Sequence, residues 1–473
     1  MGSVVASLSG CSYFESEKLD DPNNATLASV TNNATKQQLD FLSTGVFSDM
    51  RTNGDGIVWH YQITGAIGRE VYVLAGSDSR YVANLLGTNG SFDNNNFLSG
   101  RYFTTYSSAR RTARTLAQAA QNANSIVTAT QRKGYTALAK TAEAYSMLVL
   151  SDLQYENGLR VDVSDPQKPG KIQSYDVVLA AIKALLDDAA TDLAAAGTAF
   201  PFVFPAGYNT PTAGVNFRDP AGFLKFNRAL AARVAVRIAS RPGASVAKYQ
   251  DVLTALSGSF INDGSFTAGP RFNFSATALD AVNPLFQTFN NNGSVVVLAH
   301  PSFRRDIRVN DTRISKIAAR TTALTPARQG FTSADDVAIY ASNAAPVAII
   351  KREELILLSA EANAKLGNIA TAVMEVNSIA TAYNAVRPVA QGGPLTPAST
   401  AAAVIEEILY QRRYSLFYEG QRWVDLRRLN MLDNLNVGGT GKPEVSTTGL
   451  QTTVVKQLPI PFAEIAWDQA NPQ

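Results

Sequence analysis

Aromatic rings and hydrogen-bonding side chains stand close together in two polar segments of this 473-residue chain. A sugar ring presents a face of C–H groups that settles on an aromatic ring, and its hydroxyl groups pair with amides, carboxylates and guanidinium groups. The first candidate set contains Asp55, Trp59, Tyr61, Asp78, Arg80 and Tyr81. The second contains Phe274, Asn283, Phe286, Asn290 and Arg304. Both sets predict a binding surface for a saccharide or a peptide.

Motifs for catalysis are incomplete, so we expect no catalytic residue. Ser245 to Lys248 has the S-x-x-K spacing but lacks the companion K-T-G, and GGTGKP over 438–443 lacks the Ser or Thr of a phosphate-binding loop. Adjacent carboxylates such as Glu353 with Glu354, or Glu406 with Glu407, point about 100° apart on a helix. They are interpreted as helix surface. A glycosidase pair formed from distant segments remains an alternative.

Cysteine and histidine are too scarce for a zinc site or an internal disulfide, and the sequence predicts no cofactor. The chain contains one cysteine, Cys11, and two histidines, His60 and His300. Cys11 ends the segment LSGC, which resembles the lipobox of bacterial lipoproteins. Residues 1–35 are therefore expected to be a signal remnant and flexible tether, with Cys11 carrying a lipid anchor.

Composition excludes other classes of protein. The 42 Lys and Arg residues against 39 Asp and Glu give a formal charge of +3, and no basic run suggests a nucleic-acid partner. A hydrophobic content of 45% supports a large core. No apolar run approaches the eighteen residues of a membrane-spanning helix, so any membrane link is expected to be through the anchor alone.

Apolar residues recur at helical spacing along most of the chain and predict a mostly α fold. Expected helix pairs lie near 36–75, 107–153, 220–256 and 351–383, with a further helix over 175–196. In 351–383 the spacing of small and apolar positions matches a tetratricopeptide repeat. Because one pair cannot bury its own apolar face, several pairs predict a stacked helical solenoid.

Long polar segments separate these pairs, over 87–100, 197–222, 258–301 and 389–400. Loops of this length are usually functional or disordered. Their rings are Phe92, Phe97, Phe200, Phe202, Phe204, Tyr208, Phe272, Phe274, Phe286 and Phe289. We expect most of these rings to pin the loops to the solenoid and a few to remain free for binding.

The segment 405–429 predicts two short helices separated at Gly420. On these helices Asp425 can reach Arg428, and Glu419 can reach Arg422, at i+3 spacing. Pairs of this kind usually form a solvated cover over an apolar stripe. The prediction is a charged surface over an aromatic seam.

Three C-terminal segments carry a family resemblance. They are IIKREELILLSAEANAKLGNIATAVMEVN from Ile349, EGQRWVDLRRLN from Glu419 and LPIPFAEIAWDQANPQ from Leu458. Together they resemble the SusD/RagB family of nutrient-binding outer-membrane lipoproteins. The resemblance implies one SusD-like α-helical domain over 36–473, with its C-terminal signature over 405–473.

The same resemblance implies a function. A SusD-like protein would sit lipid-anchored on the outer surface of a Bacteroidetes-type cell, capture a glycan or a peptide, and deliver it to a SusC-like TonB-dependent transporter without catalysis. Two alternatives remain open at this point. One is a helical polysaccharide-degrading enzyme, and the other is an intracellular tetratricopeptide scaffold that binds protein tails.

Overall fold

A computed structural model describes residues 27–51, 56–89, 92–165, 167–210, 215–277, 280–324, 327–439 and 441–472. The fold is mostly helical, as predicted. The helices are α1 (Leu27–Asn32), α2 (Lys36–Arg51), α3 (Gly56–Ile67), α4 (Arg80–Leu85), α5 (Phe97–Asn122), α6 (Ala129–Gln154), α7 (Tyr175–Ala194), α8 (Pro220–Ala239), α9 (Tyr249–Ser257), α10 (Ser302–Asp306), α11 (Arg352–Lys365), α12 (Ile369–Ala382), α13 (Ala401–Ser415), α14 (Arg422–Arg428) and α15 (Phe462–Ala470).

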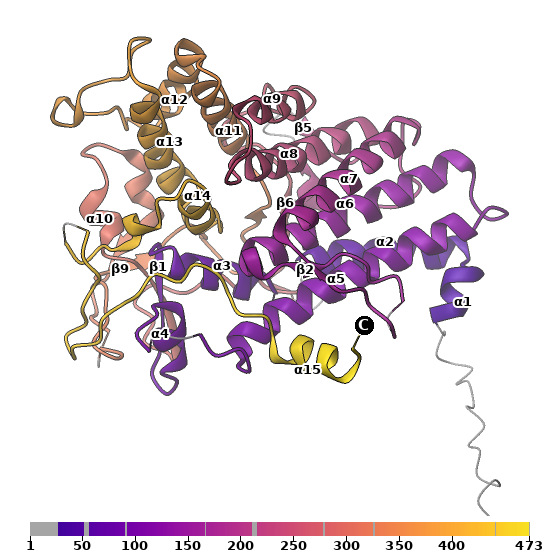
Figure 1. Cartoon of the computed structure of the whole chain (residues 1–473), viewed down its shortest axis with the longest axis horizontal. Coiled ribbons are helices and arrows are strands. Elements are labelled where there is room, and N and C mark those ends of the chain that lie inside the picture. The colour runs from indigo at the N-terminus through magenta and orange to yellow at the C-terminus, as the bar shows by residue number, and fades with distance from the viewer. Residues whose placement is uncertain are drawn as a thin grey trace, which may run out of the picture.

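The long helices stack in chain order and form the predicted solenoid (Figure 1). Each of α5 to α8 packs on the next helix, and α11 contacts α8 and α9 before pairing with α12 and α13. Local sequence determines where several helices begin. Thr128 and Gln131 form a capping box before α6, and Asp219 caps α8 with Pro220 in its first turn. None of the described helices has the length and apolar character needed to cross a bilayer.

A small sheet beside the solenoid was not predicted. Its four strands lie in the order β1 (Val71–Ala75), β7 (Val295–Ala299), β9 (Asp335–Val337) and β8 (Ile317–Ala319), all antiparallel to their neighbours. The described two-stranded pairs are β2 (Leu159–Arg160) with β3 (Ile172–Gln173), β4 (Asn209–Thr210) with β5 (Val215–Asn216), and β6 (Arg271–Phe272) with β10 (Val347–Ala348). The sheet lies at the lower left of Figure 1, below α13 and α14.

The helical hairpin predicted near 36–75 is wrong in its second half. The apolar segment 58–74 divides into α3 and strand β1, and α2 packs on α5 and α6. Both faces of β1 are buried, so its five residues show no alternation that would distinguish a strand from a helix. The loop predicted over 87–100 ends early, because Asn96 caps α5 and the helix begins at Phe97.

Charges predicted to lie on helix surfaces are largely buried instead. Glu353, Glu354 and Glu407 are at most 2% exposed, so their interpretation as helix surface is wrong. Glu354 accepts from Arg233 of α8 at 2.5 Å, and such pairing offsets the cost of removing a carboxylate from water. Of the four adjacent glutamates, Glu406 keeps an exposed side chain.

The charged pairs predicted near the C-terminus are also buried. Arg428 lies 2.9 Å from Asp425, as predicted, but both side chains are buried and form no solvated cover. Glu419 does not pair with Arg422: it binds Lys351 at 2.6 Å, while Arg422 donates to the carbonyl of Gly68. The predicted break between the helices is present, and Gly420 has a left-handed φ of +76°.

The loop rings mostly pin the loops, as expected. All ten rings except Phe289 pack in or against the main core, and Phe289 is 57% exposed. Phe200, Phe202 and Phe204 lie about 5 Å from one another between ring centroids. They pack against Phe47 of α2, Tyr135 of α6 and Phe223 of α8. Few rings therefore remain to bind a ligand.

Candidate functional site

The first candidate segment lies at one end of the β1–β7 strand pair. Gly76 donates to the carbonyl of Ser294, so the loop after β1 lies beside the loop before β7. Within the first loop, Arg80 binds both carboxylate oxygens of Asp78, at 2.9 and 2.7 Å. These hydrogen bonds from Arg80 hold the pKa of Asp78 below its usual range. The pair stays charged and fixes the start of α4.

Three rings from α3, α4 and α5 form a cluster next to this loop. Trp59 stacks on Tyr81 at 6.4 Å between centroids, and Phe97 lies 5.3 Å from each of them. Two guanidinium groups cover the cluster: Arg80 lies 4.7 Å from the centre of the Phe97 ring, and Arg101 lies 5.5 Å from that of Trp59. Rings edged by arginines suit ligands that combine apolar faces with hydroxyl or carboxylate oxygens.

Exposure separates the roles of these rings. Trp59 is 7% exposed, whereas Tyr81 and Phe97 are half-buried and offer surface to a ligand. The indole N–H of Trp59 is buried and has no hydrogen-bond partner among the described residues. Tyr61 points into the core, where its hydroxyl donates to the carbonyl of Ala348 at 3.3 Å. Asp55 lies outside the described residues.

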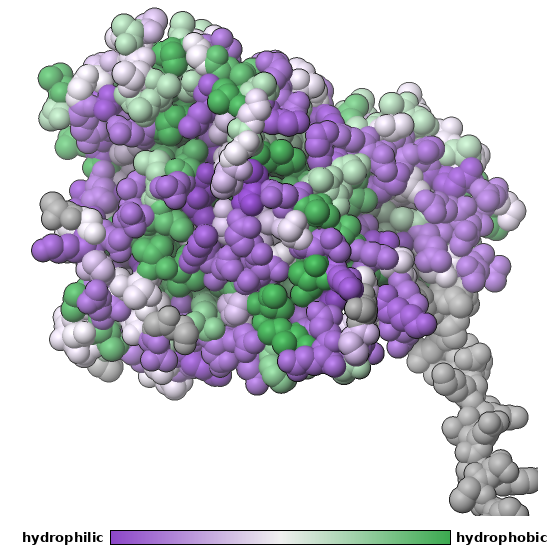
Figure 2. All heavy atoms as spheres, in the orientation of Figure 1, coloured by the Kyte–Doolittle hydropathy of each residue, from purple (hydrophilic) through white to green (hydrophobic). Residues whose placement is uncertain are grey.

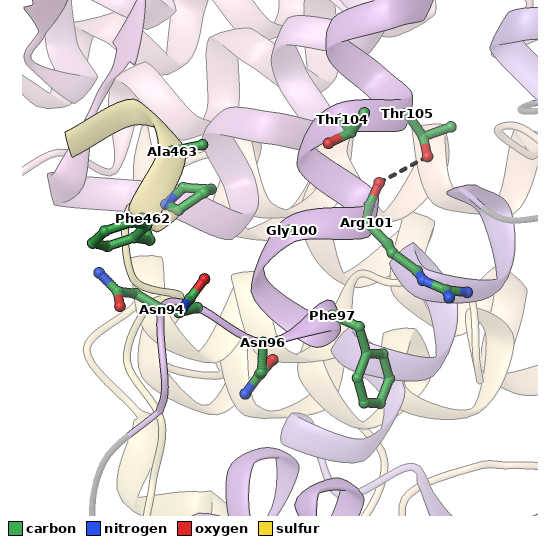
Figure 3. A pocket seen from close by; sticks show the side chains of 11 residues that line it. Asn94, Asn96, Phe97, Gly100, Arg101, Thr104, Thr105, Phe462 and Ala463 are labelled. Carbon is green, nitrogen blue, oxygen red and sulfur yellow. Dashed lines mark hydrogen bonds between the residues drawn. The ribbon is translucent and has the colours of Figure 1, made fainter. Parts of the chain in front are cut away.

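A hollow of about 420 Å³ adjoins the cluster, between the first turns of α5 and the start of α15. It is lined by Asn94, Asn95, Asn96, Phe97, Gly100, Arg101, Thr104, Thr105, Pro461, Phe462 and Ala463. Figure 3 shows Asn94 and Phe462 on one side of Gly100, and Phe97 with Arg101 on the other. Phe97 and Arg101 therefore belong both to the ring cluster and to the hollow.

The polar side chains of the second candidate set make hydrogen bonds within the protein. Asn283 donates to the carbonyl of Ala345 at 2.8 Å and caps the amide of Leu285. The side chain of Asn290 accepts from Thr321 and Thr322, so it holds two loops together. These amides are committed to the fold, which leaves them few hydrogen bonds for a ligand.

The other members of that set also make contacts within the protein. Arg304 pairs with Asp335 at 2.5 Å. Phe274 is buried beneath the guanidinium of Arg51, and Phe286 is packed against the core. That these five residues contact a ligand stays a prediction.

A serine, a histidine and a glutamate line up in the structure, although the sequence did not reveal them. Ser302 Oγ lies 2.9 Å from His300 Nδ1, and His300 Nε2 lies 3.2 Å from Glu444. Such an order resembles a hydrolase triad. Ser302 is fully buried, however, and its Oγ already accepts from Arg413 at 2.8 Å. The arrangement ties the loop around Glu444 to the sheet, where Tyr72 also donates to Glu444.

Fold and site together define a class: a helical-repeat protein that presents half-buried rings, amides and arginines beside one small sheet. The model for the SusD family matches residues 310–467, and this confirms the family resemblance of the C-terminal segments. None of the curated proteins matches the chain.

Solved structures of the SusD superfamily share the fold. A SusD superfamily protein from Parabacteroides distasonis has a TM-score of 0.68 at 14% identity, covering 92% of this chain and 98% of that one. NanU from B. fragilis has a TM-score of 0.66 at 15% identity, with 96% and 99% covered. Surface glycan-binding protein A from Bacteroides uniformis has a TM-score of 0.64 at 15% identity, with 90% and 98% covered.

The candidate residues that the sequence sets omitted lie far apart in the chain, at 94–101 and at 462. The sequence indicates Phe97 as a loop ring but not as a site residue, and it does not indicate Arg101, Asn94 or Phe462. The run of three asparagines before Phe97 was a usable signal, because amides next to a ring suit sugar hydroxyls. The position of Phe462 across the hollow depends on tertiary structure and has no local signal.

Proposed function

We propose that this protein is a SusD-like surface protein that captures a glycan and passes it on without cleaving it. The observation that supports the proposal most directly is the ring cluster of Trp59, Tyr81 and Phe97, which joins a hollow lined by amides and hydroxyls. Similarity in fold to a surface glycan-binding protein supports the same choice of ligand class.

Binding at this surface needs no chemical step. The accessible parts of the half-buried Tyr81 and Phe97 rings would contact the C–H face of a sugar, while Arg80, Arg101 and the asparagine side chains would bind its hydroxyl groups. Desolvation of the ring faces would contribute most of the affinity, and the polar groups would select the orientation.

Delivery and location complete the proposal. The protein would act as a lid on a SusC-like TonB-dependent transporter in the outer membrane, held at the cell surface by a lipid on Cys11. Cys11 lies outside the described residues, so its role rests on the sequence. Opening and closing of the lid would load the ligand and release it inward.

A binding and turnover assay tests the function. Purified protein is screened by thermal shift against soluble glycans and a peptide digest, and each ligand that binds is then incubated with the protein and assayed for new reducing ends. We expect a glycan to raise the melting temperature without cleavage. Release of reducing ends would identify a degrading enzyme instead.

Cell fractionation and affinity capture test the remaining parts. The native protein should carry an acyl mass on Cys11, enrich in the outer-membrane fraction, and copurify with a TonB-dependent transporter. A protein without the acyl group that stays in the cytosol would support the scaffold alternative. Preference for the peptide digest over all glycans would assign the ligand to the peptide class.

A further inference from the structure

Gly100 is the fourth residue of α5 and lines the hollow. Its φ is not in the left-handed region, so the backbone does not require glycine there. Apart from its chain neighbours and the backbone of its own helix, a Cβ atom built on Gly100 would meet no atom of the described residues within 4 Å. Glycine inside a helix costs roughly 0.5–1 kcal/mol relative to alanine. Neither conformation nor packing therefore explains this glycine.

Three other glycines within the described helices differ from Gly100. A Cβ on Gly65 would lie 2.8 Å from Tyr418, and one on Gly134 would lie 3.1 Å from Phe200. A Cβ on Gly222 would lie 1.8 Å from the carbonyl oxygen of Asn216. In these helices a neighbouring group occupies the space, whereas at Gly100 the space is open and forms the floor of the hollow.

The lining of this space is suited to an uncharged ligand. The described residues that line it include no carboxylate and one cation, Arg101, which extends toward Phe97 and away from Phe462 (Figure 3). The remaining polar groups are amides and hydroxyls. One of them, Asn96 Nδ2, is buried without a partner among the described residues, although Asn96 Oδ1 caps α5. A buried donor without an acceptor is costly.

Phe462 supplies an exposed ring across from Gly100. Phe462 is 50% exposed. Figure 2 shows apolar residues gathered where α15 begins. The amide of Phe462 donates to the carbonyl of Asn94 at 3.0 Å, which fixes the ring beside the asparagine run. A ring opposite amides matches the two sides of a pyranose.

One arginine holds α15, which forms this wall of the hollow, in place. No residue of α15 is buried, but Arg160 binds Glu464 and Asp468 at 2.7 Å each and lies 5.0 Å from the centre of the Trp467 ring. Arg160 is itself 6% exposed and anchored in β2. The wall is therefore positioned before a ligand arrives, which lowers the entropic cost of binding.

We propose that the hollow between α5 and α15 is a subsite for an uncharged sugar unit, with Phe462 as its stacking ring and Gly100 as the opening that admits it. The proposal rests on the proposed function. It adds that the bound sugar unit is uncharged and that it lies between α5 and α15. The hollow has a volume within the range of roughly 300–1,000 Å³ that is usual for small-molecule sites.

Two variants of the full chain test the subsite. Gly100→Leu fills the hollow with a side chain that favours helix, so the fold should be retained, and Phe462→Ala removes the ring. Ser108→Leu, at an exposed position of α5 outside the hollow, is the matched control. Affinities are measured by calorimetry for cello-, xylo-, malto- and manno-oligosaccharides, for oligogalacturonate and for a casein digest, and melting temperatures confirm folding.

We expect an uncharged oligosaccharide to bind the wild type, and both test variants to weaken it by about tenfold or more while Ser108→Leu does not. Binding of an uncharged oligosaccharide that neither variant weakens would overturn the subsite and leave the proposed function standing. Binding of oligogalacturonate or casein peptides alone would overturn the uncharged class. Absence of binding by every probe would overturn the subsite together with glycan capture.

Discussion

Arg428 donates to Glu361 at 2.6 Å and so joins α14 to α11 through two side chains that are almost fully buried. Arg428 also binds Asp425, which in turn accepts from Arg412 of α13 at 2.6 Å. Three helices that are separate in sequence thus share one chain of opposite charges. The C-terminal segment over 405–429 therefore connects these helices through buried ion pairs.

Removing Arg428 should destabilise the protein strongly. Arg428→Met leaves Glu361 buried without its cation, and we expect the free energy of unfolding to fall by about 3–5 kcal/mol. Urea denaturation measures the change. Glu406→Ala is the control, because its side chain is 64% exposed and 3.8 Å from Arg387, and it should alter stability by about 1 kcal/mol or less. Equal losses in both variants would contradict the assignment.

Removing a ring of the cluster should weaken glycan binding. Tyr81→Ala or Trp59→Ala is expected to cost about 1–3 kcal/mol of binding free energy if these rings support the ligand. Calorimetry with a ligand from the thermal-shift screen measures it. Phe41→Ala, on an exposed ring of α2, should bind like the wild type. Unchanged affinity in both cluster variants would remove this surface from the proposal.

Acid should destabilise the protein through His60. Burial lowers the pKa of His60 to about 4, from 6.5 in the unfolded chain. Between pH 6.5 and 4 the unfolded chain binds a proton that the native state does not, so stability falls as the pH falls, by up to about 3 kcal/mol.

His60→Phe removes this titration while keeping an aromatic ring. Urea denaturation at pH 7 and at pH 4.5 should show a smaller loss on acidification in His60→Phe than in the wild type. The same loss in both proteins would show that His60 does not carry the effect.

Adding a side chain at the break between α13 and α14 should be unfavourable. Gly420→Ala strains a φ of +76° and places a Cβ 3.0 Å from His60 Nε2. Gly367→Ala strains a similar φ of +84° in open space. Thermal unfolding should show a cost of about 1–2 kcal/mol at Gly367 and a larger one at Gly420, and the difference reports the contact with His60. A smaller cost at Gly420 would argue against this packing.

Sequence patterns predicted the solenoid because helical periodicity is local. The pair 351–383 needed little more than its apolar spacing and Gly367, and the structure places α11 and α12 there. The sheet was missed because β1 and β7 are short apolar runs with both faces covered, and such runs look the same in strands and helices.

The site could be predicted only in part. Trp59, Arg80 and Tyr81 do lie together, since α3, β1 and α4 are consecutive and keep them close. Phe462 meets Asn94 through folding of the whole chain, which no local pattern encodes. The burial of Glu354 was missed for the same reason, because its partner Arg233 belongs to α8 and reaches it only when the helices pack.

The buried carboxylates and arginines have one consequence for the surroundings the protein can tolerate. Mobile ions weaken attraction between groups exposed to water but reach sealed pairs such as Arg237 with Asp152 far less. A high salt concentration would destabilise a protein that depends on exposed ion pairs, but it should leave this protein folded. Because these ion pairs lie in the interior, the salinity of the medium can vary while the protein keeps its fold.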